Sequence, residues 1–185
     1  MIRYIFLSVF ALLLLTACGD NDLDQLKQSG FKECGECNLS GVDLEGADLR
    51  GVKLWKADLR GANLSMANLA GVNFSKTKLG GANLYGANLS EAYLTDKNLN
   101  GLDMEVANLS LADLALSNLS GARLGGANLY GAKLSGVDLS GADLSGANLG
   151  QADLRGAGFG DTNLDGVIGA DFTGALYVPA KYLKD

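Results

Sequence analysis

Hydrophobic residues recur at every fifth position through most of this chain. In the stretch GADLSGANLGQADLRGAG (residues 141–158), Ala is followed by Asp or Asn, then by Leu, and then by two small or polar residues. The same register runs without a gap from Cys37 to Gly166, which is 26 repeats. A period of five fits neither an α-helix, with its period of 3.6, nor a plain strand, with its period of 2. The pattern therefore predicts a compound unit that repeats along the chain.

Each unit has four kinds of position, which we name by their place relative to the Leu. The centre is Leu in 23 units and Phe74, Met104 and Phe159 in the others, and the inner residue, two places earlier, is Ala in 16 units. Between them lies the outward residue, usually Asp or Asn, and two places after the centre lies the corner residue, which is Gly in 16 units. Because residues two apart on a strand share a face, the centre and the inner residue are predicted to point inward.

A corner after each short strand would fold the chain into square coils. Gly supplies the positive φ that a type II turn requires. Four corners close one coil of four units, and stacked coils would pair as parallel strands around a column of Leu side chains. On one wall, successive Asn residues would lie above one another and exchange amide hydrogen bonds. These residues are Asn68, Asn88, Asn108, Asn128 and Asn148.

Over residues 37–166 the repeats resemble the A-(D/N)-L-x-x pattern of the pentapeptide-repeat family. The resemblance implies an all-β fold, a right-handed quadrilateral parallel β-helix, and the square shape of the coils described above rests on it. With the ends of the chain included, we expect four segments: a signal peptide (1–17), a tether and N-terminal capping helix (18–36), the β-helix (37–174) and a C-terminal cap (175–185). Leu23 and Leu26 lie at helical spacing within the expected capping helix. Tyr177, Val178, Tyr182 and Leu183 are expected to close the last coil.

The first residues, MIRYIFLSVFALLLLTAC, contain an apolar run from Tyr4 to Leu15. This run is too short to span a bilayer and is typical of a secretory signal. Leu15-Thr16-Ala17-Cys18 resembles the bacterial lipobox, which implies cleavage before Cys18 and acylation of that residue. We therefore expect an exported, membrane-anchored lipoprotein, facing the periplasm from an outer membrane if the organism has two. An ordinary signal peptide that ends near a Cys is the alternative.

The chain offers few groups for catalysis or metal binding. It contains no His, so no nucleophile has an imidazole base, and a zinc site would need four ligands that the repeats do not supply. We predict no enzymatic activity, no metal and no cofactor. The motif CGEC places Cys34 and Cys37 three residues apart, either as a buried pair or as a disulfide, which export to an oxidising compartment would favour.

Departures from the repeat are the candidate sites for partners. Met66, Val106, Leu111 and Leu116 occupy corner positions where Gly is usual, and we predict a partner surface there. Because Val is β-branched, the corner at Val106 is expected to use a different turn. Lys97 occupies an inner position, so we expect a local distortion over residues 93–104, with Lys97 reaching solvent or pairing with Asp96.

Basic residues gather in the early coils, whereas Asp dominates residues 138–171. We predict that one early group contacts anionic headgroups or an acidic envelope polymer. This group consists of Arg50, Lys53, Trp55, Lys56 and Lys76.

The function expected from these features is a non-catalytic, lipid-anchored scaffold for an unknown protein partner, with homodimerisation left open. The resemblance also suggests two alternatives. Some family members mimic DNA and bind topoisomerases, a role that the export signal and the net charge of −6, interrupted by basic residues, argue against. A carbohydrate-binding accessory module is the other alternative. We expect no nucleic-acid ligand.

Overall fold

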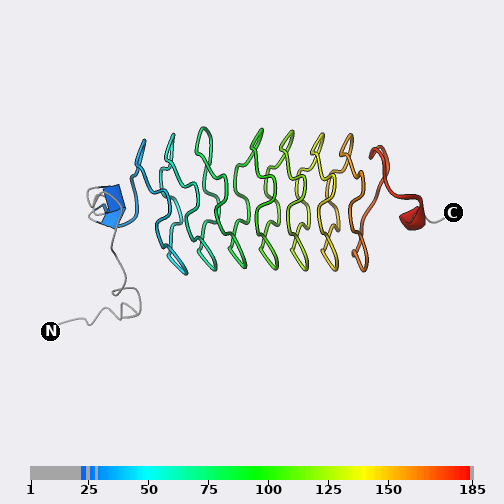
Figure 1. The fold of residues 1–185 in the computed structure, drawn as a ribbon, viewed down its shortest axis with the longest axis horizontal. Coiled ribbons are helices and arrows are strands. Elements are labelled where there is room, and N and C mark those ends of the chain that lie inside the picture. The colour runs from blue at the N-terminus through cyan, green and yellow to red at the C-terminus, as the bar shows by residue number, and fades with distance from the viewer. Residues whose placement is uncertain (1–21, 24–25, 28, 184–185) are drawn as a thin grey trace.

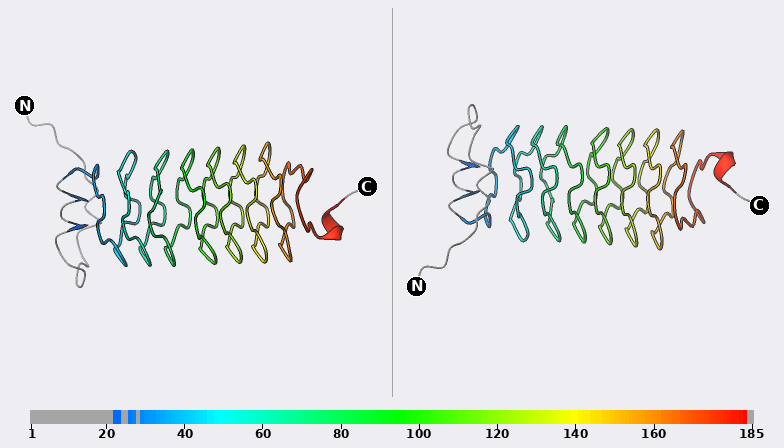
Figure 2. Two further views of the ribbon diagram at one scale, coloured as in Figure 1. Left: turned by 90° about the horizontal axis from the view of Figure 1, so that it is seen from above. Right: turned by 90° about the horizontal axis from the view of Figure 1, so that it is seen from below.

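The computed structural model describes residues 22–23, 26–27 and 29–183, which form a rod of stacked coils (Figure 1). Isolated parallel bridges join each coil to the next, as between Asp48 and Asn68 and between Asn68 and Asn88. In every bridge except that between Gly158 and Leu176, the two partners are 20 residues apart, so a regular coil contains four units, as expected. The same stacked arrangement is seen from above and below in Figure 2. Beyond the bridges, the described residues include the short 3₁₀ helix η2, Ala180–Tyr182.

The four sides of the coil are numbered here by their centres. Wall 1 contains Leu39 and every twentieth residue up to Phe159, and walls 2, 3 and 4 begin at Leu44, Leu49 and Leu54. Pairing starts with the bridge between Glu33 and Lys53, so the β-helix begins before Cys37.

The interior is a continuous apolar column. All 26 centres are buried, and so are the inner residues except Ala47, Lys97 and Ala152, which are half-buried. This confirms that the centre and the inner residue point inward. Burying one Leu side chain stabilises the folded state by about 1.5–3 kcal/mol, and each coil repeats that burial four times.

The predicted Asn ladder on wall 3 is confirmed. Each amide nitrogen donates to the amide oxygen of the Asn one coil earlier, at 3.0 Å from Asn88 to Asn68 and 3.1 Å from Asn108 to Asn88. The two further steps, to Asn128 and Asn148, are 3.2 Å each. Every Asn oxygen also accepts a backbone N–H two residues ahead, as Asn108 does from Ser110. The outward residues of this wall therefore brace both the stack and the turns.

All 26 corner residues have positive φ, including the ten that are not Gly. Val106 adopts a φ of 51°, so the expectation of a different turn at that position is wrong. Its backbone N–H donates to the carbonyl of Gly125 in the next coil at 2.9 Å, as other corner residues do. The pairing between coils fixes the path of the corner, and the side chain accepts a conformation that costs about 1–2 kcal/mol.

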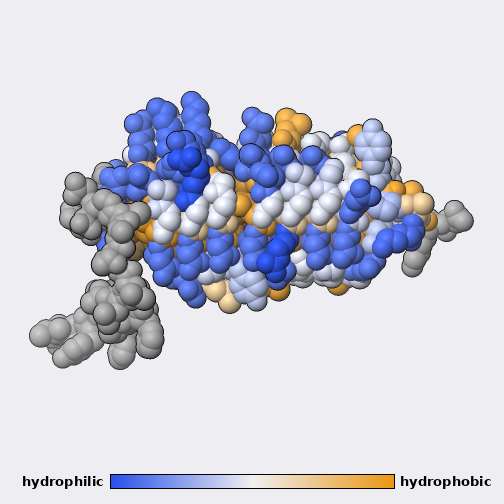
Figure 3. All heavy atoms as spheres, in the orientation of Figure 1, coloured by the Kyte–Doolittle hydropathy of each residue, from blue (hydrophilic) through white to orange (hydrophobic). Residues whose placement is uncertain are grey.

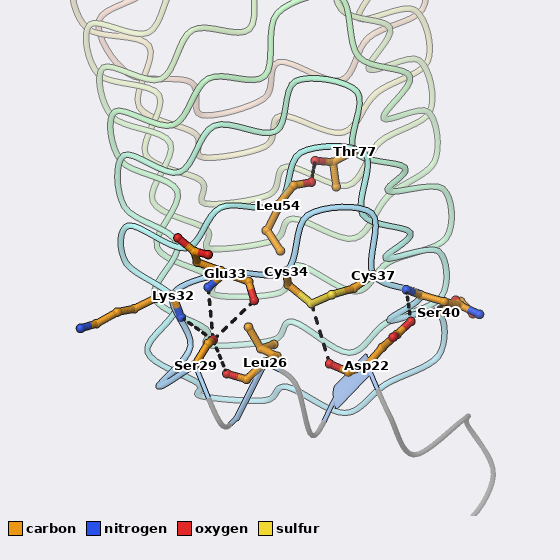
Figure 4. The surroundings of a disulfide bond; sticks show 11 residues. Asp22, Leu26, Ser29, Lys32, Glu33, Cys34, Cys37, Ser40, Leu54 and Thr77 are labelled. Carbon is orange, nitrogen blue, oxygen red and sulfur yellow. Dashed lines mark hydrogen bonds between the residues drawn. A yellow bond between two sulfur atoms is a disulfide. The ribbon is translucent and has the colours of Figure 1, made fainter.

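At the N-terminal end, the segment that contains Asp22 and Leu26 lies against the open edge of the first coil (Figure 4). Asp22, Leu23, Leu26 and Lys27 have helical conformation, but residues 24, 25 and 28 lie outside the described part, so no continuous capping helix is defined. Leu23 and Leu26 are buried, and the Asp22 carboxylate accepts the backbone N–H of Asn38 at 2.7 Å. Since no strand among the described residues precedes Asn38 in the stack, Asp22 takes the place of a strand for that N–H.

At the C-terminal end the register slips. Leu176 pairs with Gly158, so this last coil is two residues shorter than the regular ones. Val178 and Tyr182 pack against the core, and the Tyr182 hydroxyl accepts the backbone N–H of Leu164 at 3.1 Å. Tyr177 is 82% exposed, and Leu183 is also exposed, so the expectation that these two close the last coil is wrong.

Candidate interaction surfaces

The described residues carry no group of three or more His, Cys, Asp or Glu side chains that could hold a metal ion. Among the residues that the structure places, we find no apolar helix of the length that a bilayer requires. Cys18 and the apolar run from Tyr4 to Leu15 lie outside the described residues.

Cys34 and Cys37 form a disulfide bond (Figure 4). Both residues are buried in the first coil, with Cys34 at a centre position of wall 4 and Cys37 at an inner position of wall 1. The bond lies directly over the segment containing Asp22, whose carbonyl is 3.9 Å from the Cys34 sulfur. The disulfide thus ties the corner between these two walls next to the end of the rod.

The four apolar corner residues are exposed but do not form one patch. Met66, Val106, Leu111 and Leu116 are between 52% and 67% exposed. The last three occupy successive corners of one coil, and Met66 shares a corner with Val106 two coils earlier. On the face seen in Figure 3, hydrophobic side chains likewise form small separate groups among hydrophilic ones.

Each of these side chains leans over the Gly at the same corner of the next coil. A Cβ at Gly131 would lie 2.7 Å from a methyl carbon of Leu111, and one at Gly136 would lie 2.9 Å from a methyl carbon of Leu116. Met66 and Val106 cover Gly86 and Gly126 in the same way. Each of these four apolar corner residues is therefore accommodated by a Gly one coil later, a pairing that the sequence alone did not reveal.

The predicted basic group is largely neutralised by neighbouring carboxylates. Lys53 pairs with Glu33 at 2.7 Å and Lys56 with Glu36 at 2.9 Å, each one coil earlier. Arg50 forms two bonds to Asp48, at 2.8 and 2.7 Å, and its hydrogen bonds lower the pKa of that carboxyl. Because such exposed pairs contribute little to stability, their main effect is to reduce the positive field of the early coils.

Two lysines of this group lie beside the ring of Trp55. Its indole is 47% exposed, with the Lys56 ammonium 4.1 Å and the Lys76 ammonium 5.7 Å from a ring centroid. Lys76 forms no ion pair with any carboxylate of the described residues. The structure therefore brings Lys53, Trp55, Lys56 and Lys76 to one region of wall 4, and it leaves Arg50 bound to Asp48.

The same region contains an interruption of the backbone pairing, which sequence reasoning missed. Between the coils at Leu54 and Phe74, the backbone N–H groups of Leu54, Lys56 and Asn73 have no hydrogen-bond partner among the described residues. The surface is open there, with a volume of about 340 Å³ lined by residues 51–55, 71–73 and 75. The sequence feature that could have indicated this interruption is the size of the interior side chains. Phe74 replaces a Leu, and both Val52 and Val72 replace Ala.

A second interruption surrounds Lys97. The N–H groups of Leu79 and Asn98, which would join their two coils, have no partner among the described residues. The Lys97 ammonium lies between these coils and donates to the carbonyl of Thr77 at 3.3 Å, while the Lys97 N–H donates to the hydroxyl of Ser117 at 3.0 Å. A wider interval between coils is visible in Figure 1, where blue-green gives way to green.

The local distortion expected around Lys97 is therefore present, but the ammonium binds a carbonyl inside the stack instead of a group at the surface. Burial lowers the pKa of Lys97, and the charge of nearby Asp96 opposes that shift. Thr77 and Ser117, the inner residues one coil below and above, donate their hydroxyls to Leu54 and Leu94 carbonyls. Polar inner residues from three successive coils are thus stacked along wall 1.

Comparison with known proteins agrees with this architecture. The family model "Pentapeptide repeats" matches residues 98–136, 107–146 and 132–174, in 8 copies, and the model "Pentapeptide repeat region" matches residues 25–104. No curated protein matches the chain.

Three solved structures illustrate the range of similar proteins. HetL, a pentapeptide-repeat protein involved in heterocyst differentiation regulation from the cyanobacterium Nostoc sp. strain PCC 7120, is 40% identical over 74% of this chain and 67% of its own, with a TM-score of 0.37. A pentapeptide-repeat protein from the Arabidopsis thaliana thylakoid lumen is 30% identical over 68% of this chain and 70% of its own (TM-score 0.30).

QnrB1, a plasmid-mediated fluoroquinolone resistance protein, is 21% identical over 80% of this chain and 85% of its own, with a TM-score of 0.57. At that identity the likeness concerns the fold alone. The repeat pattern, the pairing of strands four units apart and the two family models that together cover residues 25–174 lead to one conclusion: this chain belongs to the pentapeptide-repeat family.

Proposed function

We propose that this protein is a non-catalytic, lipid-anchored scaffold of the bacterial cell envelope. The observation that carries the proposal is the rod itself: a buried Leu column supports an outer surface on which residues vary without disturbing the core. Such a surface suits the binding of a partner better than turnover, which needs a cleft with positioned acid, base or nucleophile.

The lipid anchor is supported by the sequence of residues 1–18. The apolar run and the lipobox-like segment before Cys18 stand at the spacing of a bacterial lipoprotein. Two or more acyl chains would give stable attachment, since each buried methylene contributes about 0.8 kcal/mol. The first bridged residue of the β-helix, Glu33, follows Cys18 by 15 residues, so the first coil would lie near the membrane.

Fractionation of cells tests the anchor. Wild-type protein is expected in the membrane fraction, and globomycin, which blocks lipoprotein signal cleavage, should cause the uncleaved form to accumulate. Cys18→Ala removes the acylated sulfur and serves as the variant, while Cys34→Ala with Cys37→Ala is the matched control that keeps Cys18. If wild-type protein is found in the cytosol, or if globomycin has no effect, the anchor is refuted.

A DNA-mimicking, topoisomerase-binding protein is the alternative, in line with the fold shared with QnrB1 and with the Asp-rich coils of residues 138–171. That role requires the cytosol and a continuous acidic face. On this rod, Arg123, Lys133 and Arg155 form ion pairs with the carboxylates around them. Binding of purified gyrase to the full chain, together with a cytosolic location, would favour this alternative over the scaffold.

A further inference from the structure

The opening in wall 4 combines three features that occur together here. The backbone pairing between two coils is interrupted, the single Trp of the chain lies at the edge of the opening, and lysine ammonium groups surround that Trp. We propose that this opening is a binding site for an acidic sugar, a hexose that carries a carboxylate. The site does not depend on acylation of Cys18 and goes beyond the scaffold role.

The interrupted backbone offers both donors and acceptors. The free N–H groups belong to Leu54, Lys56 and Asn73, and the carbonyls of Val52, Asn73 and Ser75, their partners in a regular stack, are equally unpaired among the described residues. Backbone polar groups need partners, so water or a ligand must serve them. A bare anion would satisfy only the donors, whereas sugar hydroxyls both donate and accept.

The side chains around the opening suit the rest of such a ligand. Trp55 presents a large, half-exposed apolar ring with a polar edge, which can cover the C–H face of a sugar. Lys76 lies near that ring without a carboxylate partner in the described chain, so its ammonium is available for a charge-assisted hydrogen bond to the sugar carboxylate. The volume of about 340 Å³ is within the range of small-ligand sites.

The interior side chains beside the opening suggest the variant that tests the proposal most directly. Phe74, Val52 and Val72 occupy positions that are Leu or Ala in all later regular coils of wall 4. The double substitution Val72→Ala and Phe74→Leu restores the common residues and should allow the two coils to pair. This variant closes the opening but leaves Trp55 and every lysine in place.

Fluorescence of Trp55 reports binding directly, because no other Trp is present. The full chain is titrated with tetragalacturonate, with maltotetraose as the neutral sugar and with inorganic phosphate as the bare anion. We expect tetragalacturonate to bind, with an affinity at least about tenfold above that of the other two probes. The closed variant and Lys76→Ala should each weaken tetragalacturonate binding about tenfold or more.

Lys133→Ala is the matched control, since Lys133 is exposed on the same wall, where the pairing is intact. It should bind like the wild-type protein. Unfolding curves for each variant establish that it is folded; if the closed variant does not fold, Lys76→Ala and isothermal titration of Trp55→Ala decide the question. The proposal is overturned if tetragalacturonate does not bind, if the folded closed variant binds it as well as wild type, or if phosphate or anionic vesicles bind equally well at the same residues.

Discussion

Residues 51–100 and residues 101–160 are built from the same five-residue unit, but only the second stretch stacks without interruption. In the first stretch the pairing fails beside Phe74 and again beside Lys97. In the second, the inner and centre positions hold Ala, Val, Ser and Leu apart from Met104 and Phe159, and the bridges continue coil after coil. The comparison shows that the interior, more than the surface, decides how regular the rod is, because coils about 4.8 Å apart leave little room for larger side chains.

The largest difference should appear when a Leu is removed from each stretch. Leu109→Ala, in the regular stretch, should lower the free energy of unfolding by about 2–5 kcal/mol, because the intact coils cannot collapse into the cavity. Leu54→Ala, beside the wall 4 opening, should fall at the lower end of that range, because its surroundings can relax. Denaturant unfolding followed by circular dichroism measures both, and equal losses would contradict the comparison.

Replacing Lys97 by the usual residue should make the first stretch more regular. Lys97→Ala removes an ammonium from the stack and frees the Thr77 carbonyl to accept the N–H of Asn98. We expect a gain of about 1 kcal/mol in the free energy of unfolding and slower amide exchange at Leu79 and Asn98. A clear loss of stability would show that the ammonium holds the two coils together.

The pH dependence of stability supplies an independent test at the same residue. Because burial lowers the pKa of Lys97 below its ordinary 10.5, the unfolded chain binds more protons in the range between the two values. The free energy of unfolding should therefore rise as the pH increases through the lowered pKa towards 10.5. Lys97→Met should lack this rise, and unfolding curves at a series of alkaline pH values compare the two proteins.

Strain at the corners of the regular stretch should produce two modest changes in stability, of opposite sign. Val106→Gly relieves a left-handed conformation and should raise stability by about 1 kcal/mol, after the greater freedom of Gly in the unfolded chain is taken into account. Gly121→Ala is the matched control: a Cβ there meets nothing within 4 Å, and its φ is 65°, so it adds strain without a clash. It should lower stability by a similar amount, and thermal unfolding measures both.

Surface ion pairs should have the smallest effect. The hydrogen bond from the Arg155 guanidinium is the main cause that lowers the pKa of Asp153 from 3.8 to about 2. The stabilisation it gives is present above pH 3.8 and is lost as the pH falls through about 2. Carbon-13 NMR titration of the Asp153 carboxyl should show this pKa, and Arg155→Gln should return it towards 3.8.

The fold could be predicted from the sequence because the same five-residue pattern occurs 26 times. The Leu column follows from one period and one rule about strand faces, whereas the coil of four units, and with it the Asn ladder, also rests on the resemblance to the pentapeptide-repeat family. The candidate sites could not be predicted to the same depth. The sequence shows Trp55 and its lysines, but the pairing of Lys53 with Glu33, and the missing bonds at Leu54, depend on neighbours in the adjacent coil.

The sequence by itself determined which residues face inward, because a period of five allows one inward set. Only the tertiary structure decided the conformation of Val106, the side chains leaning over Gly131 and Gly136, and the place of the Lys97 ammonium. The physical reason is that stacking fixes the backbone of each coil through the coil before and after it. Where the pairing is strong, residues adopt backbone conformations that they do not prefer by themselves. Where an interior side chain is too large, the pairing between coils is lost.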